Sequence, residues 1–577
     1  MRRRAGPGGT RAALALAAAL ALAGTAGAAP APAPLAARRV ELRLGPGGYR
    51  VSQEPRKFSE LETSRCLECH GLPAFFARDS ASGEVLALSV DSVAFHASAH
   101  GAIACTACHG DVREFPHRFT GRRPAVGCDA DCHARDRAGK PVRHGEAMAA
   151  FRRSAHARGL AGRADDPDCA YCHGGGDAHA AAPVRTLDRP QRLELCASCH
   201  EDAERMARDH VDPGAVDSYR RGFHARALAL GDTTAAVCDD CHDAHGTLAS
   251  RQRDASTAPG RLPATCGRAR CHPGASERFA RSGTDHLPLA VRRARAARAL
   301  AGGLAWAGAA IVLGFLAAVA IDLRRPLRAP RAAGRGGEPL VPRLSLGVRL
   351  QHAGLALSFT VLALTGLAMR FPTLAALRSL GTLLGGWGAV RGIHRAAAVV
   401  LLATVVAHLA DATVRLARAR FDARRAWPLL PGAGDAREAR ETLLYHLGRR
   451  ELPPEYGRHE FRAKLHYLAV CWGVPVMALS GLVLWLDARL AARLPRAALA
   501  LATLVHGEEA MIAIAVVLVW HLYNVAWAPG RGLRLLTALD GRVTASNQRI
   551  QHGREPAAAA TARPVAEAAG AGAAFRH

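Results

Sequence analysis

Fourteen of the fifteen cysteines fall into seven short motifs that all end in Cys-His. Five motifs have the spacing Cys-x-x-Cys-His, and they are Cys66–His70, Cys105–His109, Cys169–His173, Cys196–His200 and Cys238–His242. Two motifs are longer, namely Cys128–His133 and Cys266–His272. Two thiols at this spacing can form thioether bonds to the two vinyl groups of one haem, and the following histidine then lies under the iron as its proximal ligand.

Disulfide bonds and zinc sites are the competing interpretations, because both also use cysteines that are close in sequence. Neither explains a histidine directly after every second cysteine. The sequence therefore predicts seven covalently bound haem c groups. The predicted thioether cysteines are Cys66, Cys69, Cys105, Cys108, Cys128, Cys132, Cys169, Cys172, Cys196, Cys199, Cys238, Cys241, Cys266 and Cys271. The predicted proximal ligands are His70, His109, His133, His173, His200, His242 and His272.

A second set of histidines could bind the opposite face of each iron. His100, His156 and His224 end a weak repeat of the form aromatic–x–x–small–x–His. Met148 and Met206 lie outside this repeat, so we expect two histidine ligands at most haems and hence low reduction potentials. One iron could instead keep an open position. The ten candidate distal ligands are His96, His100, His117, His144, His156, His179, His210, His224, His245 and His286.

The net charge of +27 is unevenly distributed along the chain. Residues 29–296 carry 38 Lys+Arg and 33 Asp+Glu, a net charge of +5, and the propionates of seven haems would make this region acidic. The excess positive charge lies at the N-terminus and in the second half of the chain, so we do not expect nucleic-acid binding. Residues 1–28 have the arginine-rich start, apolar stretch and small-residue cleavage site of a signal peptide.

Five apolar stretches in the second half of the chain are each long enough to span a bilayer as a helix. They are Ala299–Ile321, Leu346–Met369, Ile393–Val414, Leu465–Leu486 and Leu501–Trp527. Because haem c is attached outside the bacterial cytoplasm, the motifs belong on the outer side. The arginine-rich connections then lie inside, as the positive-inside rule expects.

The sequence thus predicts an all-α protein. A haem-cored multihaem cytochrome c domain with little regular structure is followed by a membrane domain of five helices, one anchor and a four-helix dihaem bundle. The predicted parts are a signal peptide at 1–28, a linker and N-terminal segment at 29–57, a periplasmic heptahaem domain at 58–290, an anchor helix at 299–322, a cytoplasmic linker at 323–345, a cytochrome b domain at 346–530 and a cytoplasmic basic, then disordered, tail at 531–577. This organisation predicts a protein of the bacterial inner membrane.

Six histidines lie in or at the spans, although histidine is costly inside a bilayer. His394 and His408 are 14 residues apart, and His506 and His521 are 15 apart. These separations correspond to about 21 Å along a helix and keep each pair on roughly one helix face. Two such helices can hold two non-covalent b haems, one near each membrane surface. The remaining histidines of the six are His352 and His466.

Residues 346–530 resemble the dihaem cytochrome b subunit (gamma subunit) of membrane-bound formate dehydrogenases and hydrogenases. The matching residues are Arg349-x-x-His352, Thr365-Gly366, Arg391-x-x-His394, His506 and His521-x-Tyr523. The resemblance implies that His394 and His506 bind the outer haem and that His352 and His521 bind the inner one. His408 stays as an alternative to His352.

The whole chain resembles the inner-membrane quinol:cytochrome c oxidoreductases of metal-respiring bacteria, which join a periplasmic multihaem domain to this type of b domain. The resemblance implies electron transfer between the quinone pool, such as menaquinone, and periplasmic c-type cytochromes or reductases. The alternative is an electron-transfer subunit that anchors a separate dehydrogenase or reductase and has no catalytic site. A substrate-reducing multihaem enzyme is a third hypothesis, which would require an open iron.

Two groups of residues could handle the protons of a quinol. Glu508 and Glu509 lie beside His506 at the predicted outer face and could accept such protons, although a solvated interfacial pair is the simpler interpretation. Tyr445, His446 and His459 are weaker candidates for an inner quinone site. His466 is interpreted either as a third-shell residue of the haem or as a residue on the quinone side. The sequence leaves the direction of electron flow open.

Overall fold

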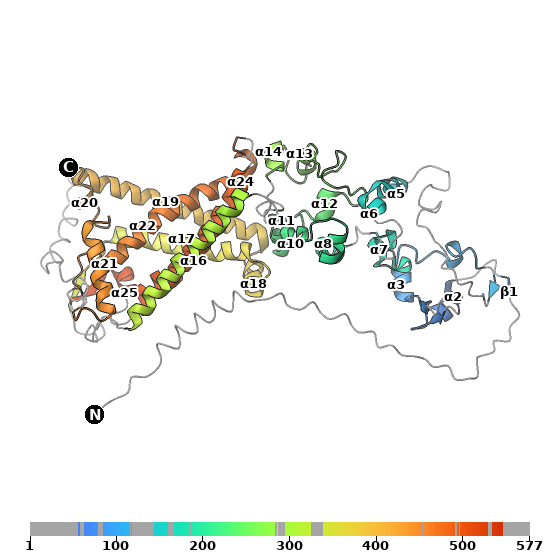
Figure 1. The fold of residues 1–577 in the computed structure, drawn as a ribbon, viewed down its shortest axis with the longest axis horizontal. Helices are drawn as coiled ribbons and strands as arrows, with labels where there is room; N and C mark the ends of the chain where they lie inside the picture. Colours follow the sequence, from blue (N-terminus) through green and yellow to red (C-terminus); the bar gives the residue numbers. More distant parts are fainter. Residues whose placement is uncertain are drawn as a thin grey trace, which may run out of the picture. The chain divides into compact units, whose positions relative to one another are not determined.

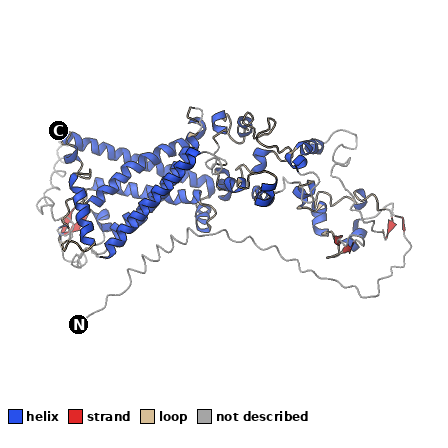
Figure 2. Cartoon of the chain, in the orientation of Figure 1, coloured by secondary structure: helices blue, strands red, loops and turns tan. Residues whose placement is uncertain are grey.

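The computed structural model describes residues 56–57, 63–78, 85–112, 114–115, 117, 143–159, 167–183, 187–282, 286, 295–324, 339–452, 454–490, 493–495, 497–528, 534–545 and 548. The predicted signal peptide, the third motif with Cys128, Cys132 and His133, and most of the predicted tail lie outside these residues. Two compact units divide the chain, residues 1–130 with 169–182 and residues 131–168 with 183–577. Helices are the main regular elements of both units, and turns and loops connect the short helices of the first unit (Figure 2).

In the first unit, three of the predicted motifs form or adjoin short helices (Figure 1). The first motif ends α2 (Thr63–His70), the second starts with the 3₁₀ turn η1 (Cys105–Ala107), and the fourth begins α7 (Cys169–Gly174). The other elements are β1 (Arg56–Lys57), β2 (Phe76–Arg78), β3 (Val85–Ala87), α3 (Ser92–Ala97), β4 (Glu114–Phe115) and η2 (Ala178–Ala180). A Cys-x-x-Cys-His motif is thus one or two helical turns long, which directs both thiols and the imidazole to one side.

In the second unit, the fifth motif ends α8, the sixth forms α12, and the seventh begins at the last residue of α13. The described helices before the membrane domain are α5 (Arg143–Arg153), α6 (Ala155–Gly159), α8 (Arg189–His200), α9 (Ala203–Arg208), α10 (Ala215–Arg220), α11 (Phe223–Ala229), α12 (Cys238–His242), α13 (Leu262–Cys266) and α14 (Glu277–Ala280). Asp188 caps α8 through the N–H of Gln191, whose side chain accepts from the N–H of Asp188. This cap fixes the start of a helix that ends in the fifth motif.

The membrane domain contains five helices that are long and apolar enough to cross a bilayer, which confirms the predicted number of spans. Four of them are α16 (Arg295–Arg324), α17 (Leu346–Arg370), α19 (Gly386–Arg418) and α22 (Phe461–Trp485), and the fifth starts as α24 (Ala498–Val516). α17 packs on α19, α22 packs on α24, and α16 packs on α24 (Figure 1). Each span is longer than the apolar stretch in the sequence, and four of the five continue into polar residues at one or both ends.

The fifth span changes its winding where the inner histidine lies. After α24 it continues as two π-helical turns, η4 (Val517–His521) and η5 (Tyr523–Trp527). π-Helical turns are rare and occur frequently at functional sites, because the wider turn re-aims side chains. No pattern in the sequence predicts this change of winding.

Short elements complete the membrane domain. They are β5 (Leu340–Pro342), α18 (Ala375–Leu383), α20 (Ala423–Ala426), α21 (Ala433–His446), α23 (Asp487–Leu490), α25 (Arg534–Asp540) and β6 (Arg542–Thr544). β5 pairs antiparallel with β6, and the pairs β1–β4 and β2–β3 lie in the first unit. The prediction of an all-α protein is therefore confirmed for the main elements, with three short strand pairs added between loops.

Candidate functional site

Two pairs of histidine rings face one another in the membrane domain. His394 on α19 and His506 on α24 have ring centres 6.4 Å apart. His352 on α17 and His521 in η4 also have ring centres 6.4 Å apart. The structure thus brings together the two combinations that the resemblance implied, each from helices that are distant in sequence.

The distance between these ring centres can be compared with the distance expected when both rings bind one metal ion. A metal lies about 2 Å from each coordinating imidazole nitrogen, so the centres of two opposed imidazole rings are roughly 6 Å apart. The two observed distances of 6.4 Å agree with this value. Both pairs therefore fit the axial positions of a haem.

Two hydroxyl groups orient the outer pair. The Thr365 hydroxyl donates to the Val361 carbonyl at 2.6 Å, so it must accept the hydrogen bond from His394 Nδ1 at 2.9 Å. Ser480 repeats this geometry, because its hydroxyl donates to the Val476 carbonyl and lies 3.0 Å from His506 Nδ1. With the proton on Nδ1, the Nε2 lone pair of each ring is left for a metal.

A glycine follows each of these hydroxyl residues. A Cβ atom on Gly366 would lie 3.5 Å from His394 Cε1, and one on Gly481 would lie 3.2 Å from His506 Cε1. The second contact is tighter than most side chains tolerate, so glycine leaves room for the ring. The resemblance rests on Thr365-Gly366 and not on Ser480-Gly481, although the two dipeptides have the same chemistry.

Replacing Thr365 and Ser480 together with valine is expected to weaken haem binding by the outer pair. Valine keeps the shape of threonine but cannot accept the Nδ1 hydrogen bond, and loss of such an outer partner typically costs about 10–100-fold in metal affinity. The b-haem content of the purified variant and the midpoint potential of the outer haem measure the effect. Thr413→Val is the matched control, because that hydroxyl bonds only the Leu409 carbonyl in the described structure. An equal loss in the control would contradict the assignment.

Two motifs of the first unit show the same ring spacing. The ring centre of the first proximal candidate, His70, lies 6.0 Å from that of His117. The ring centre of the second, His109, lies 6.1 Å from that of His179, and the rings are stacked in both pairs. Backbone carbonyls accept from Nδ1 of two proximal rings, Leu88 from His70 at 2.7 Å and Ala182 from His173 at 2.9 Å. These contacts again leave Nε2 available.

The motifs of the second unit add two further pairs. His200 lies 6.2 Å from His156, and His272 lies 6.2 Å from His224. The second distance shows that the longer seventh motif has the same spacing between ring centres as the regular motifs. His242 of the sixth motif lies close enough to His286 for their charges to interact.

The other distal candidates are less clearly placed. Among the described residues, the ring contact of His96 is with Phe95, and no metal-spaced ring was found for His210. His100 and His245 lie in the segments that follow α3 and α12. His144 belongs to α5, but its side chain is outside the described part.

Burial keeps several of these imidazoles neutral. Desolvation lowers the pKa of His156 and His200 below the ordinary value for histidine, and it lowers the pKa of His242 to about 4. Desolvation also lowers the pKa of His109, with the neighbouring His179 acting in the same direction. A metal must displace the proton from a ligand, so a neutral ring binds it without that cost.

Two family models match the chain. Residues 343–538 match prokaryotic cytochrome b561, and residues 101–278 match the outer membrane cytochrome MtrC/MtrF-like, domains II/IV. The chain joins a multihaem cytochrome region to a cytochrome b membrane domain. This fusion binds haem c and haem b and transfers electrons at a membrane. No curated protein matches the chain.

The two matches leave parts of the chain uncovered. The model of cytochrome b561 begins at residue 343, after the whole of α16, and the multihaem model begins at residue 101, after the first motif. The site of His70 and His117 is therefore supported by the first motif and by the ring geometry, and the family match does not cover that motif.

His408 of the cytochrome b domain does not join a ring pair. Its Nδ1 lies 2.9 Å from the Gln351 side-chain oxygen and therefore donates, which leaves Nε2 to accept from the Tyr467 hydroxyl at 3.1 Å. Trp427 packs edge-on against the ring. Both nitrogens of His408 thus have protein partners, whereas the ring of His352 faces His521 directly.

The predicted proton acceptors at the outer end of the cytochrome b domain have different surroundings. Glu508 forms an ion pair with Arg370 at 2.8 Å, with both side chains about one-third exposed. Gly507 makes this pair possible, because a Cβ atom there would collide with the Arg370 guanidinium. Glu509 points to α22, where its Oε1 would lie 3.2 Å from a Cβ on Gly473. Of these two glutamates, Glu509 is therefore the one that has no ion pair among the described residues.

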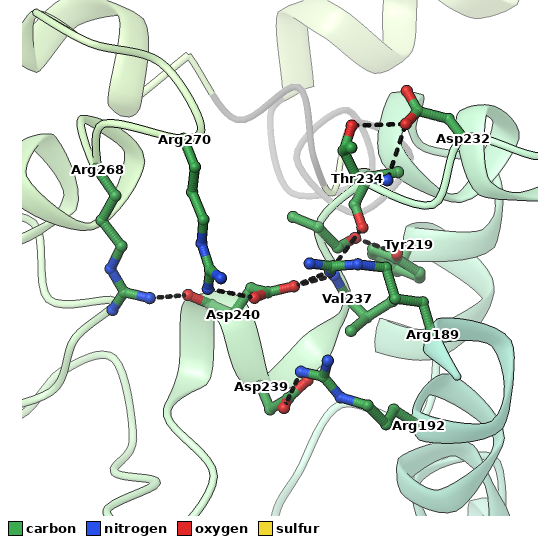
Figure 3. A network of polar contacts seen from close by, with 12 residues as sticks. Arg189, Arg192, Tyr219, Asp232, Thr234, Val237, Asp239, Asp240, Arg268 and Arg270 are labelled. Carbon is green, nitrogen blue, oxygen red and sulfur yellow. Dashed lines mark hydrogen bonds and ion pairs between the residues drawn. The ribbon is translucent and has the colours of Figure 1, made fainter. Parts of the chain in front are cut away.

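Two aspartates inside the sixth motif tie the last three motifs of the multihaem region together (Figure 3). Arg189 and Arg192, from the start of α8, form ion pairs with Asp240 and Asp239 respectively. From the seventh motif, Arg268 donates to the Asp240 carbonyl at 2.8 Å, and Arg270 lies 3.3 Å from the Asp240 carboxylate. These arginines fix the relative positions of neighbouring haem attachment sites.

Replacing Asp240 with asparagine is expected to destabilise this region by about 1–3 kcal/mol at neutral pH, the range for a buried charged hydrogen bond that loses its charge. Burial alone would raise the pKa of Asp240, but the Val237 N–H and the two arginines of α8 hold it below the ordinary value. A lowered folded-state pKa gives stability that is present at neutral pH and lost as the pH falls through that pKa.

The expected difference between wild type and Asp240→Asn therefore shrinks in acid. Thermal unfolding followed by circular dichroism of the haem bands, as a function of pH, measures it. Asp254→Asn is the control, because its partner Arg261 and Asp254 itself are largely exposed. A constant difference at all pH values would contradict the electrostatic explanation.

Proposed function

We propose that the protein is a quinol:cytochrome c oxidoreductase of the bacterial inner membrane. In this proposal two b haems and seven c haems connect the quinone pool with periplasmic c-type cytochromes or reductases. The observation that carries it is a continuous series of metal-spaced histidine pairs, from the inner pair to the pair of the seventh motif. Each step of this series is supported by contacts within the second unit.

The two membrane pairs lie at different depths. Thr365 bonds His394 of the outer pair and lies 13 residues after His352 on the same helix α17. Thirteen residues of α-helix span about 20 Å. One pair thus lies near each surface of a hydrocarbon layer that is about 30 Å thick. This arrangement supports electron transfer across the membrane domain.

An aromatic contact links the outer pair to the multihaem region. The Phe223 ring lies 5.0 Å from the Trp387 ring at the start of α19, and the Arg391 guanidinium lies 5.5 Å from the Phe223 ring. Phe223 directly precedes His224 of the seventh-motif pair, and Arg391 lies one turn before His394. The seventh haem is therefore the natural junction with the outer b haem.

Buried backbone and side-chain contacts hold this junction rigidly. The Trp387 N–H donates to the Leu230 carbonyl at 3.1 Å, just after α11. Leu230 and Trp387 belong to one buried apolar cluster with Ala227 and Ala235. This cluster packs the start of α19 against the end of α11.

Haem supplies one-electron carriers to these positions. The chain's own residues hold neutral imidazoles at metal spacing, set their tautomers with hydroxyl and carbonyl acceptors, and keep the surroundings apolar. Burial and the ligand type tune the potential of each carrier. Two histidine ligands at most irons support low potentials.

The orientation follows from the same proposal. The motifs lie in the periplasm, the connections at 323–345 and 415–464 lie in the cytoplasm, and the C-terminus is cytoplasmic. The arginine-rich composition of these connections supports this orientation. On this basis the His352–His521 pair is the inner one.

The decisive experiment uses the purified full chain in lipid nanodiscs. A menaquinol analogue is expected to reduce the b haems first and then the c haems, without any partner protein. A pyridine haemochrome assay with protein quantification is expected to give seven c and two b haems. Absence of quinol-driven reduction would overturn the proposal and favour a subunit that anchors a separate dehydrogenase or reductase.

A further inference from the structure

The first span, α16, packs along the fifth span through one face (Figure 1). Gly308, Phe315 and Asp322 follow one another at intervals of seven residues, which is two helical turns and therefore one side of the helix. Gly308 and Asp322 are buried, and a Cβ atom on Gly308 would lie 2.9 Å from Ile512 Cγ1. Trp306 lies about 180° around the helix from Phe315 and is 81% exposed. Only one side of α16 is thus used for this contact.

Two contacts of this face hold the fifth span on either side of His521. The Phe315 ring stacks on the ring of Trp520, the residue before His521, with ring centres 4.9 Å apart. The Asp322 carboxylate is buried and accepts a hydrogen bond at 2.6 Å from the hydroxyl of Tyr523, two residues after His521. α16 therefore contacts both neighbours of the inner histidine.

Two other elements fix the position of the Asp322 carboxylate. His446 of α21 donates from Nε2 to its second oxygen at 2.9 Å, and the Arg462 guanidinium of α22 lies 3.6 Å from that oxygen. A carboxylate inside a membrane segment is costly and usually functional, and well-packed apolar residues would hold helices together equally well. α16 also lies outside the residues that match cytochrome b561, so this carboxylate is an addition to that domain.

The contacts of α16 coincide with the π-helical part of the fifth span. His521 ends η4, and η5 starts two residues later. A π-helical turn is rare, so packing rather than local backbone preference has to hold it. A side chain also takes part in this winding, because the Asn524 amide donates to the Trp520 carbonyl at 2.7 Å. The direction of the His521 ring therefore depends on the contacts that flank it.

We propose that α16 is a positioning element for the inner b haem, in which Phe315 and Asp322 hold the π-helical turns on both sides of His521 and so fix the direction of its ring. This inference rests on the two b haems of the proposed function and not on its quinol chemistry. The direction of an axial ring determines how strongly it stabilises ferric over ferrous iron, and hence the reduction potential. The first span then sets a property of the electron path in addition to anchoring the chain.

The relative orientation of the axial rings gives this inference a spectroscopic signature. The ring planes of His352 and His521 are 37° apart, whereas those of His394 and His506 are 69° apart. The angle between two axial imidazoles determines the splitting of the iron d orbitals, so the low-field electron paramagnetic resonance (EPR) signal of a ferric haem moves with it. The two b haems are therefore expected to give different signals, and a rotation of His521 moves only the inner one.

The test uses variants of the full chain in lipid nanodiscs. Phe315→Leu and Tyr523→Phe each remove one of the two flanking contacts. Trp306→Leu is the matched control, because it changes an exposed aromatic residue on the opposite side of the same helix. Asp322→Asn removes the charge but keeps an oxygen that accepts from Tyr523. The b-haem absorption is titrated with chemical redox mediators, EPR spectra are recorded, and His521→Ala identifies the transition of the inner haem.

Phe315→Leu and Tyr523→Phe are each expected to weaken the preference of the inner site for ferric iron about tenfold, the lower end of the range for loss of an outer partner. A tenfold change corresponds to a rise of about 59 mV in the potential of a one-electron carrier. The low-field signal of the inner haem moves in both variants, and the outer haem keeps its potential and signal. Trp306→Leu changes neither haem, and Asp322→Asn leaves the low-field signals in place.

Three results would overturn the inference. One is an inner-haem potential and signal that stay as in wild type in both Phe315→Leu and Tyr523→Phe. Another is an equal shift of both b haems, which indicates general loosening of the bundle. The third is a Trp306→Leu variant that shifts the inner haem as far as Phe315→Leu does. If Phe315→Leu does not assemble, Tyr523→Phe alone decides.

The same measurements distinguish this inference from the proposed function. Redox mediators and EPR need no quinol, so the positions of the two b-haem transitions do not depend on the electron donor. A protein whose b haems respond as expected but which menadiol cannot reduce would reject the proposed function and support the positioning role of α16. A His521→Ala variant that keeps both b haems would reject the assigned inner haem and this inference with it.

Discussion

Replacing His521 with alanine is expected to remove one of the two b haems and to stop quinol-driven reduction of the c haems. His521 faces His352 at metal spacing, and no other described imidazole has the same relation to His352. The loss of one axial ligand leaves a non-covalent haem with a single bond to the protein. Electron transfer across the membrane needs a haem at each of the two depths. The effect on electron transfer is therefore larger than the loss of half the b haem suggests.

His408→Ala is the matched comparison, since the sequence made His408 the alternative inner ligand. Its two nitrogens bond Gln351 and Tyr467, so the variant is expected to keep both b haems and most of the electron-transfer rate. A haemochrome ratio of c to b haem, together with the reduced spectrum of the b haems, measures both variants. The assignment would be reversed if His408→Ala lost a haem while His521→Ala kept two.

The haem motifs and the spans were predictable because their chemistry is local in sequence. A thioether pair and its histidine occupy five to seven consecutive residues, and an apolar helix shows in about 20 residues. The pairing of distal histidines is different. His117 pairs with His70 and His224 with His272, in each case across more than forty residues and in no constant direction along the chain.

The membrane histidines include features that the sequence predicts and features that only the structure shows. Their spacing along two helices predicted two haems. The choice between His352 and His408 as the inner ligand, however, depends on the hydrogen bonds of His408, which appear only in the structure. The partner Ser480 was missed although Thr365-Gly366 had been noticed, since one Ser-Gly pair in an apolar helix is not informative alone. The π-helical turns around His521 depend on packing against α16 and carry no sequence pattern.

Asp322 marks a third kind of residue that sequence reasoning overlooked. An acidic residue at the end of an apolar stretch is ordinarily an interfacial group, and the sequence analysis treated it as part of the boundary of the anchor. Only the packing of α16 on η4 and α21 buries it against His446 and Arg462. Its burial depends on elements that are more than a hundred residues away in the sequence.

Replacing Cys266 and Cys271 with serine is expected to lower the haem c content by one and to isolate the b haems from the rest of the c haems. The seventh motif supplies His272, which pairs with His224, and Phe223 beside it contacts Trp387 near the outer pair. Without this haem, electrons from quinol reach the b haems but have no carrier at the junction. Stopped-flow spectra are expected to show fast reduction of b haem and little reduction of c haem.

Cys66→Ser with Cys69→Ser provides a control of equal chemical severity. This variant also loses one haem c, but its motif lies in the first unit, while the junction contacts lie entirely in the second unit. Reduction of the remaining c haems by quinol is therefore expected to proceed at close to the wild-type rate. Electron transfer that survives removal of the seventh motif but fails after removal of the first would place the junction elsewhere.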